Sequence, residues 1–551
     1  MRLRRETTAA LLVFLLALSL RVLFLVDFRA SPYFDNLLID PASYDRWAER
    51  IAAGDFWGDR VFYQAPLYAY FLGGLYALFG RDLLLVRVVQ AVLGSLTCAL
   101  LFLLTSKIFS FRRGILAGLL AALYTPLLFM DLMILKSVVV LFFLSLSLLR
   151  FEDAISRRSP LRLAQAGILL GVAITGRGNL LFALPFLLAW LFFREERPLS
   201  RASLSLVGVF LLGTVLAIAP VTIRNRAVGG DWVLVESDAG INVYVGNNPA
   251  ATGIHTPPLD IRTVPEHEER DAARLAERET GRAMKPSEVS GFWIEKAIRF
   301  ARSHPKEEAR LLWRKLRLAW NGYEVPDNYD LAYFSRISWI FRGFLPSFLW
   351  ISPFAALGFV LSLRSWRRTG FLHLYVVAYV LSLLVLYVTS RYRLPVVVGL
   401  LPFAAHGFLG FLEMARARAF RRAIPAALLL IAVWHFGRAS LFEYRGFAKQ
   451  ETEIATFLAD RGDHEGAERA FERAIEEGKG SGSLHLVHMN QGAFFLRTGR
   501  LDDAAGAFRN ALRANPAFTP ARIELEKIEA ERKVPPVSPG ASRAGEPGPS
   551  R

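Results

Sequence analysis

Long apolar segments, separated by short arginine-rich segments, constrain this chain more than any other feature. Hydrophobic residues make up 53% of its 551 residues, and several apolar runs approach the roughly 20 residues that an α-helix needs to cross a bilayer. Because helices satisfy their own backbone polar groups in lipid, such runs predict a mainly α-helical, polytopic membrane protein. The predicted spans, about eleven, are near 8–26, 84–106, 114–130, 132–149, 163–176, 179–193, 203–221, 344–363, 371–389, 394–414 and 423–440.

The basic residues indicate how the spans are oriented. A net charge of +17 would suggest nucleic-acid binding in a soluble protein, but here the arginines cluster at the ends of apolar runs, so nucleic acid is not an expected partner. If the short apolar run 66–80 is interfacial or re-entrant instead of crossing, the N-terminus and all later basic clusters share one side. The positive-inside rule assigns that side to the cytoplasm. The clusters are 107–113, 150–162, 194–201, 364–368 and 416–422.

This topology divides the membrane part of the chain into two regions. An N-terminal transmembrane region is expected at 1–221, with its first outer loop at 28–83, and a C-terminal transmembrane region at 344–440. The first apolar run follows three arginines but is too long for a cleaved signal peptide, so it is expected to remain as an anchor.

The largest outer loop, 222–343, is expected to form a small mixed subdomain on the periplasmic side. Valines and isoleucines alternate at 233–235 and 241–245, which predicts short strands joined by turns. Helices are expected near 288–302 and from Pro305 onward. Alternatively, the loop is only a lid over the membrane domain.

The segment 450–532 is expected to be helical and to contain an internal repeat. Alanines and a phenylalanine at 467–474 recur at 504–511, an offset of 37 residues. This offset is close to the tetratricopeptide unit of about 34 residues, so we expect two repeats and a terminal helix that dock on the membrane domain or bind a protein partner. The tail 533–551 is rich in proline, glycine and serine and is expected to be disordered.

The first outer loop carries an acidic residue, Asp40, directly before a short amphipathic run. The apolar residues Tyr44, Trp47 and Ile51 recur at helical spacing, so this run is suited to lie along a membrane surface. Asp40 could serve there as a catalytic base, or it could only cap the helix by accepting hydrogen bonds from its first N–H groups. The residues alone leave both interpretations open.

Cations near the outward ends of the predicted spans are candidates for binding a phosphate. Arginine can hold two phosphate oxygens in its planar fork, although a cation near a span end can also snorkel to lipid headgroups. Arg391 and Arg393 stand two residues apart, so on an extended turn they should project the same way. Asp131 is a candidate second acid, a solvent-facing turn residue, or the ion-pair partner of Lys136. The candidate cations are Arg391, Arg393, Arg224, Arg177 and Lys136.

Aromatic and amide side chains of the outer segments are candidates for contacting a substrate. Asparagine beside glycine or proline more often forms a turn, and aromatic residues near span ends also anchor loops at the interface. These alternatives stand beside the substrate role. The candidates are Tyr44, Tyr68, Asn242, Asn247 and Tyr392.

Three motifs lie in these outer segments, in a fixed order. They are Asp40 with Tyr44, Ala65-Pro66-Leu67-Tyr68, Gly80 and Arg87; Gly240-Ile241-Asn242 to Gly246-Asn247-Asn248-Pro249; and Ser390-Arg391-Tyr392-Arg393-Leu394-Pro395. Together they resemble the family 39 glycosyltransferases, which include relatives of protein O-mannosyltransferases and of the lipid A aminoarabinose transferase. The resemblance covers about residues 1–440, and the second motif is similar to members that also carry tetratricopeptide repeats.

The resemblance implies a C-type glycosyltransferase bundle in a bacterial inner membrane. It implies a sugar donor linked to polyprenyl phosphate, an acidic residue in the first outer loop, here Asp40 as the candidate base, and transfer to an acceptor protein or glycolipid on the periplasmic face. Many members carry an Asp-Glu pair where this chain has Asp40-Pro41, which argues against a metal bound by that loop. No cofactor is specified, and a divalent metal stays an alternative.

Two other classes of function remain as alternatives. A transporter or flippase for lipid-linked sugars would need ionisable residues at the bilayer midplane and paired broken helices, whereas these spans carry few charges except near their ends. A non-catalytic membrane scaffold for the repeats would not require the elaborate first loop or the arginine-rich turn before residue 394.

Overall fold

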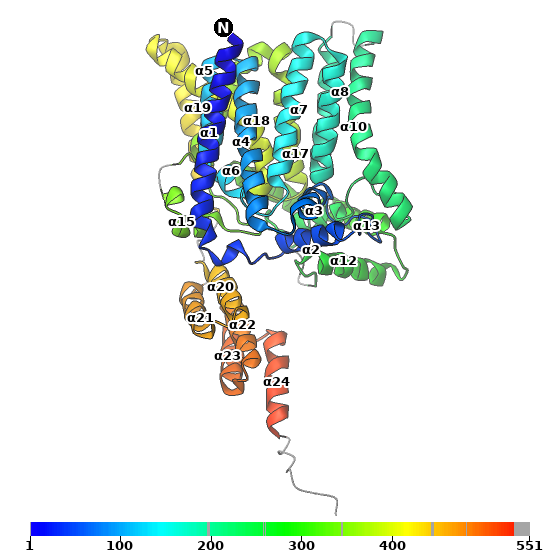
Figure 1. Ribbon diagram of the computed structural model, residues 1–551, viewed down its shortest axis with the longest axis vertical. Coiled ribbons are helices and arrows are strands. Elements are labelled where there is room, and N and C mark those ends of the chain that lie inside the picture. The colour runs from blue at the N-terminus through cyan, green and yellow to red at the C-terminus, as the bar shows by residue number, and fades with distance from the viewer. Residues whose placement is uncertain are drawn as a thin grey trace, which may run out of the picture. The chain divides into compact units, whose positions relative to one another are not determined.

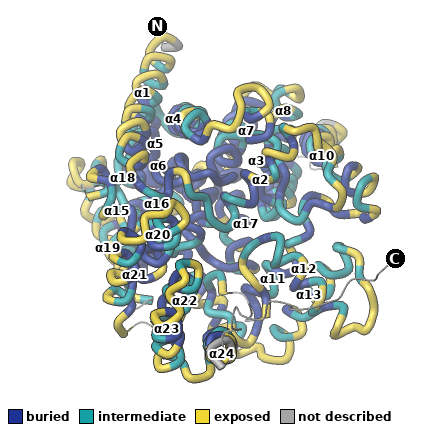
Figure 2. Tube along the Cα trace, turned by 60° about the horizontal axis from the view of Figure 1, so that its bottom comes forward, coloured by how far each residue is buried: buried dark blue, intermediate teal, exposed yellow. Residues whose placement is uncertain are grey.

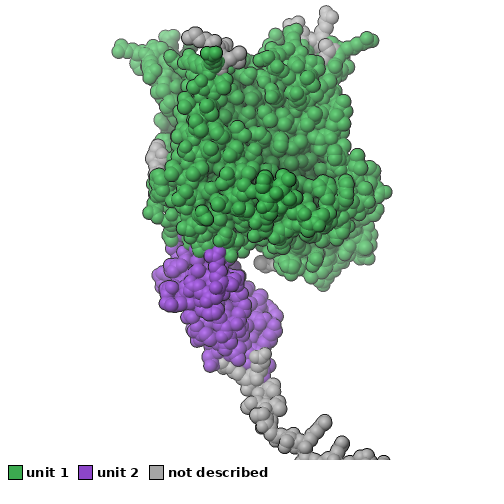
Figure 3. Space-filling view, viewed as in Figure 1, with its two compact units in different colours: residues 1–441 green, residues 442–551 purple. Residues whose placement is uncertain are grey.

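The chain folds almost entirely into helices, as its apolar pattern predicts. The computed structural model describes residues 2–195, 199–256, 258, 260–342, 345–441, 446–480 and 482–533. Within these ranges there is no β-strand, so the predicted mainly α-helical fold is confirmed. Two compact units form, 1–441 and 442–551 (Figure 3). The tail that we expect to be disordered lies outside the described residues beyond Lys533.

Long helices of the first unit run side by side (Figure 1). Each predicted span overlaps at least one of them, and buried residues gather between them while their outer turns are exposed (Figure 2). They are α1 (Arg2–Arg29), α4 (Leu83–Ile108), α5 (Phe111–Leu123), α7 (Ser137–Arg157), α8 (Pro160–Gly176), α9 (Ala183–Phe193), α10 (Arg201–Gly229), α16 (Phe348–Ser362), α17 (Trp366–Val385), α18 (Ser390–Arg416) and α19 (Phe420–Arg438).

Not all of these helices are long enough to cross a bilayer unaided. Two predicted spans are shorter or broken: 114–130 divides at Tyr124 into α5 and α6 (Thr125–Met130), and 132–149 becomes helical only at Ser137. The chain is a multi-pass membrane protein, but a total of eleven crossings stays a prediction. Six stretches of the described residues have the length and apolarity of a span: Arg4–Arg29, Leu83–Ile108, Ser203–Gly229, Phe348–Val385, Ser390–Arg416 and Phe420–Arg438.

Small residues let these helices approach closely. On α8, Gly167 and Gly171 lie one turn apart and face α10, where a Cβ would collide with the backbone at Phe210 and Thr214. In lipid, apolar side chains gain little by leaving their surroundings, so close backbone packing of this kind is a main source of helix association. The glycines therefore fix which helices are neighbours.

The basic turns lie together at one end of the bundle. Lys107 forms an ion pair of 2.6 Å with Asp153, which joins the turn after α4 to the end of α7. Arg113 pairs with Glu413 near the end of α18, and Arg5 at the N-terminus stacks 4.3 Å over the ring of Phe111. This grouping matches the arrangement that the positive-inside rule requires. The orientation itself stays a prediction.

Short helices form a layer at the opposite end (Figure 1). The run 66–80 folds as α3 (Leu67–Phe79), whose 13 residues span only about 20 Å at 1.5 Å each, and it packs beside α2 (Asp40–Ala52), which fits the interfacial interpretation. The other elements of this layer are η1 (Pro32–Phe34), η2 (Gly178–Phe182), α11 (Ala239–Gly246), α12 (Pro265–Thr280), α13 (Pro286–Ser303), α14 (Pro305–Trp320), α15 (Leu331–Ile337) and η3 (Trp339–Arg342), whereas η4 (Leu363–Ser365) adjoins a basic turn at the other end.

The strands predicted in the outer loop do not form, so the subdomain is helical and not mixed. Residues 241–245 belong to helix α11, because Ile241 and Val245 are one turn apart and pack together against Trp293 of α13. Val233 and Val235 lie in irregular backbone whose carbonyl oxygens accept hydrogen bonds from the Asn225 amide at 3.0 and 3.1 Å. A side chain thus takes the place of a partner strand. The helices expected near 288–302 and from Pro305 are confirmed as α13 and α14.

The second unit consists of paired helices that follow the predicted repeat. Positions 467, 470, 471 and 474 are buried in the first pair, and their equivalents 37 residues later are buried in the second. Gly462 and Gly499 end the first helix of each pair with φ of 82° and 74°, a conformation that favours glycine. The helical repeat is confirmed, and its assignment to the tetratricopeptide class stays a prediction. The helices are α20 (Ala448–Asp460), α21 (His464–Gly478), α22 (Leu484–Arg497), α23 (Leu501–Ala514) and α24 (Thr519–Lys533).

A buried ion pair joins α1 to the segment after α6. Arg21 donates from Nε to Asp131 Oδ2 at 2.8 Å, and both residues are almost fully buried. Asp131 is therefore not a solvent-facing turn residue, and its partner is not Lys136. An acid that is held by an arginine inside the bundle has a structural role, because an unpaired charge there would be strongly destabilising.

Substituting Asp131 by alanine should lower the free energy of unfolding by about 3–5 kcal/mol, because Arg21 would remain charged and unpaired. The measurement is an unfolding titration of the purified protein in detergent micelles. Glu295→Ala is the matched control, since its pair with Arg299 is exposed and should contribute less than about 1 kcal/mol. Equal losses in the two variants would show that the buried pair does not stabilise the bundle.

Candidate active site

Asp40 begins helix α2 but does not cap it. The residue before the helix is Ile39, at φ 53° and ψ −119°, and its side chain makes no capping hydrogen bond. A positive φ is costly for a β-branched residue, and such strain is found mainly where the surrounding structure enforces it. The Asp40 carboxylate points instead to other segments of the chain, which favours the functional interpretation over the capping one.

The Asp40 carboxylate is held by three residues distant in sequence. Arg391 Nη1 lies 2.7 Å from Oδ2, and the Asn328 amide donates to the same oxygen at 3.1 Å. Gln64 donates to Oδ1 at 3.3 Å, and the backbone N–H of Asp40 donates to Asn328 Oδ1. Arg391 Nε also lies 2.8 Å from Asp327 Oδ2. The first outer loop, the segment before α15 and the start of α18 therefore meet at one carboxylate.

These contacts decide the charge of Asp40. Burial opposes its ionisation, but the positive charge and hydrogen bond of Arg391, the charge of Lys136 and the hydrogen bond from Asn328 outweigh it. Together they hold the pKa of Asp40 below its ordinary value. Asp40 is therefore an ionised carboxylate at neutral pH.

Arg391 and Arg393 do not project the same way, contrary to the prediction. Their segment is the first turn of α18, and residues two apart on a helix point about 200° apart. Arg393 lies 2.6 Å from Glu324 and stacks on Phe348. Arg391 alone reaches Asp40, so the two arginines have separate environments.

Arg177 is buried without a hydrogen-bond partner for its guanidinium. It follows the last turn of α8 and stacks 4.6 Å above the ring of Tyr392, the residue after Arg391. Within the described residues none of its three guanidinium nitrogens makes a hydrogen bond of good geometry or an ion pair, although the Tyr379 hydroxyl lies close enough to interact. Because a buried cation is costly when it is unpaired, this position is suited to an anion that the chain itself does not supply.

Lys136 lies beside a group of carboxylates that the sequence analysis did not single out. Its Nζ is 3.7 Å from Glu236 Oε2, and its charge also acts on Asp40 and Asp238. Burial, followed by the charge of Glu236, raises the pKa of Asp238 well above its ordinary value. Burial, reinforced by Asp40, raises the pKa of Glu268 to about 7. Glu236 and Asp238 lie in a loop otherwise rich in apolar residues and glycine, whereas Glu268 lies on α12 among other charged residues that hide it in the sequence.

The remaining candidates are mostly structural. Tyr44 and Tyr68 are fully buried and pack edge to face, so they stabilise the first loop instead of facing a substrate. Asn242 accepts a hydrogen bond from Tyr387, and Asn247 accepts one from Lys315 at 2.7 Å. Tyr392 lies between the two cations, Arg177 and Arg391.

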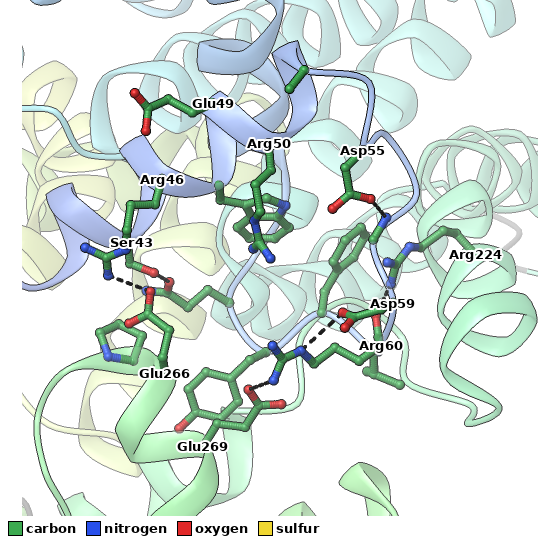
Figure 4. A pocket seen from close by; sticks show the side chains of 18 residues that line it. Ser43, Arg46, Glu49, Arg50, Asp55, Asp59, Arg60, Arg224, Glu266 and Glu269 are labelled. Carbon is green, nitrogen blue, oxygen red and sulfur yellow. Dashed lines mark hydrogen bonds and ion pairs between the residues drawn. The ribbon is translucent and has the colours of Figure 1, made fainter. Parts of the chain in front are cut away.

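Arg224 lies in the wall of a large pocket (Figure 4). Its guanidinium donates to the backbone carbonyl oxygens of Trp57 and Arg60 and stacks 3.8 Å over Phe62. In the part of the chain that the structure describes, no contact joins it to Asp40. The structure thus separates Arg224 from the other candidate cations.

No group of three or more histidine, cysteine, aspartate or glutamate side chains among the described residues is arranged to hold a metal ion. The acids around Asp40 are paired with Arg391, Lys136 and amide groups instead.

The fold and site define a multi-pass helical membrane protein with a buried ionised pair in the layer opposite its basic turns. Residues 63–223 match the family described as dolichyl-phosphate-mannose-protein mannosyltransferase, which confirms the predicted resemblance over this part of the chain. No curated protein matches the sequence.

Several solved structures are similar at low sequence identity. The apo oligosaccharyltransferase of Archaeoglobus fulgidus is 15% identical, with a TM-score of 0.43 over 83% of this chain and 59% of that one. The same organism's oligosaccharyltransferase AglB, in complex with an inhibitory peptide and a dolichol-phosphate, is also 15% identical, with a TM-score of 0.40 over 83% of this chain and 59% of that one. ArnT from Cupriavidus metallidurans, bound to undecaprenyl phosphate, is 17% identical, with a TM-score of 0.32 over 75% of this chain and 79% of that one. The chain thus spans 59% of the length of these oligosaccharyltransferases.

The raised pKa of Glu268 predicts a pH-dependent stability. The pKa of this glutamate is 4.5 in the unfolded chain and about 7 in the folded protein. The protonated carboxyl therefore contributes its full share to the free energy of unfolding below pH 4.5, and that share is lost as the pH rises through 7. Glu268→Gln should therefore be more stable than the native protein at pH 8, and no more stable at pH 4.5. Thermal unfolding in detergent at the two pH values measures this.

The exposed residue Glu307 provides the control for this comparison. Glu307→Gln should change stability little at either pH. If Glu268→Gln showed no gain at pH 8, Glu268 would not be held protonated by its surroundings.

Proposed function

We propose that this protein is a membrane glycosyltransferase that moves a sugar from a polyprenyl-phosphate donor to an acceptor hydroxyl on the periplasmic face. The single observation that carries the proposal is the pairing of ionised Asp40 with Arg391, in the layer opposite the basic turns. The match of residues 63–223 to a mannosyltransferase family supports the reaction class. The particular sugar, a hexose or a pentose, is not specified by these observations.

The reaction needs a base and a cation next to each other. Asp40 takes the proton of the acceptor hydroxyl, whose oxygen forms a bond to the anomeric carbon of the sugar. The bond from that carbon to the phosphate oxygen breaks, and polyprenyl phosphate leaves with the electron pair. Arg391, which contacts Asp40 at 2.7 Å, is placed to stabilise the charge that develops on this phosphate.

Arg177 supplies a second cation for the donor phosphate. It is buried, lies next to Tyr392 and has no hydrogen bond to the described residues, so binding a phosphate would satisfy it. Lys136 is close to the same acids and adds positive charge. Arg393 is paired with Glu324 and fits a structural role better.

The orientation follows from the charges at the two ends. The basic turns gather at one end of the bundle, which the positive-inside rule places in the cytoplasm, and Asp40 lies in the layer at the other end. In a bacterial inner membrane that layer would face the periplasm. The helical repeats after residue 446 would then be periplasmic and available to a protein partner.

Asp40→Asn tests the base directly. The amide keeps the size of the side chain but cannot accept the proton, so transfer from a labelled polyprenyl-phosphate sugar should fall by at least about a hundredfold. The variant should still elute as a monodisperse membrane protein. Asp260→Asn, an exposed position in the largest outer loop, should retain native activity. Full activity of Asp40→Asn would exclude Asp40 as the base.

Arg177→Ala tests the phosphate site. Removing a charged hydrogen-bond donor should weaken binding of polyprenyl phosphate about 10- to 100-fold, measured by native mass spectrometry of the protein titrated with the lipid. Arg226→Ala is the matched control, because Arg226 is an exposed arginine near the outward end of α10. Equal lipid affinity in both variants would contradict the role of Arg177.

A further inference from the structure

A large pocket lies beside the proposed site but does not include Asp40. Its volume is about 640 Å³, and its walls are α2, the loop that follows it, Arg224 of α10 and the first turns of α12 (Figure 4). Two ion pairs join the walls: Arg46 with Glu266 at 2.7 Å and Arg60 with Glu269 at 3.4 Å. The pocket is therefore a defined feature of the outer layer and not a gap between loops.

The lining of this pocket is mixed: it combines apolar surface with charged groups that are nearly balanced. Four arginines and five carboxylates line it. A strongly anionic or strongly cationic ligand would gain little from such a mixture, whereas a neutral ligand with many hydroxyl groups could donate to the carboxylates and accept from the guanidinium groups.

One arginine and the aromatic residues of the lining are available to a ligand. Arg50 lies on α2, its side chain extends into the pocket in Figure 4, and within the described residues it has no hydrogen bond or ion pair. Trp47 and Tyr63 are half-buried and add aromatic surface, whereas Phe62 is buried against Trp47 and the Arg224 guanidinium. Free hydrogen-bonding groups beside aromatic surface suit a sugar, which has both polar edges and apolar C–H faces.

A short chain of hydrogen bonds connects the pocket to Asp40. Ser43 and Gln64 line the pocket, and the Ser43 hydroxyl donates to Gln64 Oε1 at 3.0 Å. Gln64 Nε2 in turn donates to Asp40 Oδ1 at 3.3 Å. Gln64 thus lines the pocket and contacts the proposed base, so a hydroxyl of a bound molecule could reach Asp40 if Gln64 turned away.

We infer that this pocket binds the acceptor, and that the acceptor is a saccharide. The inference rests on the proposed function, and it specifies the substrate class of the same site. The reacting hydroxyl belongs to the sugar that lies nearest Gln64, while Arg50 and the aromatic residues hold the ring. A peptide that binds by adding a strand would need a sheet edge, and the described lining offers none.

Binding is tested without any transfer reaction. The full-length protein in lipid nanodiscs is examined by saturation-transfer-difference NMR with free glucose, galactose, mannose, N-acetylglucosamine and their β-linked disaccharides, and with a neutral serine- and threonine-rich peptide. At least one sugar should bind, and Arg50→Ala should weaken its binding about tenfold. Arg278→Ala, an exposed position on α12 outside the pocket, is the control and should bind like the native protein.

Three outcomes would overturn the inference. They are binding of the peptide but of no sugar, binding of neither, and sugar binding that survives both Arg50→Ala and Trp47→Ala. Both Arg50→Ala and Trp47→Ala are tested because either substitution could also disturb α2. Circular dichroism checks that each variant keeps the native helix content.

The same proteins separate this inference from the proposed function. If sugars bind through Arg50 but no polyprenyl-phosphate sugar is ever consumed, the transferase proposal fails and the saccharide pocket stands. If Asp40→Asn abolishes transfer while Arg50→Ala leaves the acceptor KM at its native value, the pocket is not the acceptor site and the transferase proposal stands. With both proposals correct, Arg50→Ala raises the acceptor KM about tenfold.

Discussion

The ion pair between Asp40 and Arg391 joins parts of the chain that are 351 positions apart. Both groups are largely buried, and a buried charge is tolerated only when an opposite charge and hydrogen bonds replace the water it has lost. Asn328 and Asp327 complete this shell from a third segment. The outer loops are therefore fixed to the start of α18 by the need to neutralise one carboxylate, and the candidate site exists only where these segments meet.

The need to neutralise buried charge also distinguishes the roles of the other charged residues. Arg21 neutralises Asp131, and Arg393 lies against Glu324, so these ionisable groups stabilise the bundle and are not free for a substrate. Arg177 differs from them because its guanidinium has an aromatic ring beside it but no hydrogen-bond partner among the described residues. A cation in that state is the position where an incoming phosphate would gain most.

In the outer layer, the Gln64 side chain lies between two different environments. It contacts Asp40 on one side and lines the pocket of mixed charge on the other. Arg391 contacts Asp40, and Arg177 stacks on Tyr392 beside it, whereas the pocket is lined by charges of both signs and by aromatic residues. A donor phosphate and a hydroxyl-rich acceptor require these two environments, and a glycosyl transfer requires that they adjoin.

The sequence by itself determined the helical membrane fold, the grouping of basic turns at one end and the helical repeat at 467–511, and it singled out Asp40 as a candidate. Each of these follows from local periodicity, from charge placement or from a short motif, and therefore needs no knowledge of distant contacts. The strands predicted within 233–245 were wrong. The Asn225 side chain donates hydrogen bonds to the backbone of 233–235, and residues 241–245 form helix α11, which packs on α13. Tertiary structure alone decided which charge pairs with which, since partners such as Arg21 and Asp131 are brought together by the packing of helices that the sequence does not order in space. The pocket and its link to Asp40 likewise depend on where three separate segments meet.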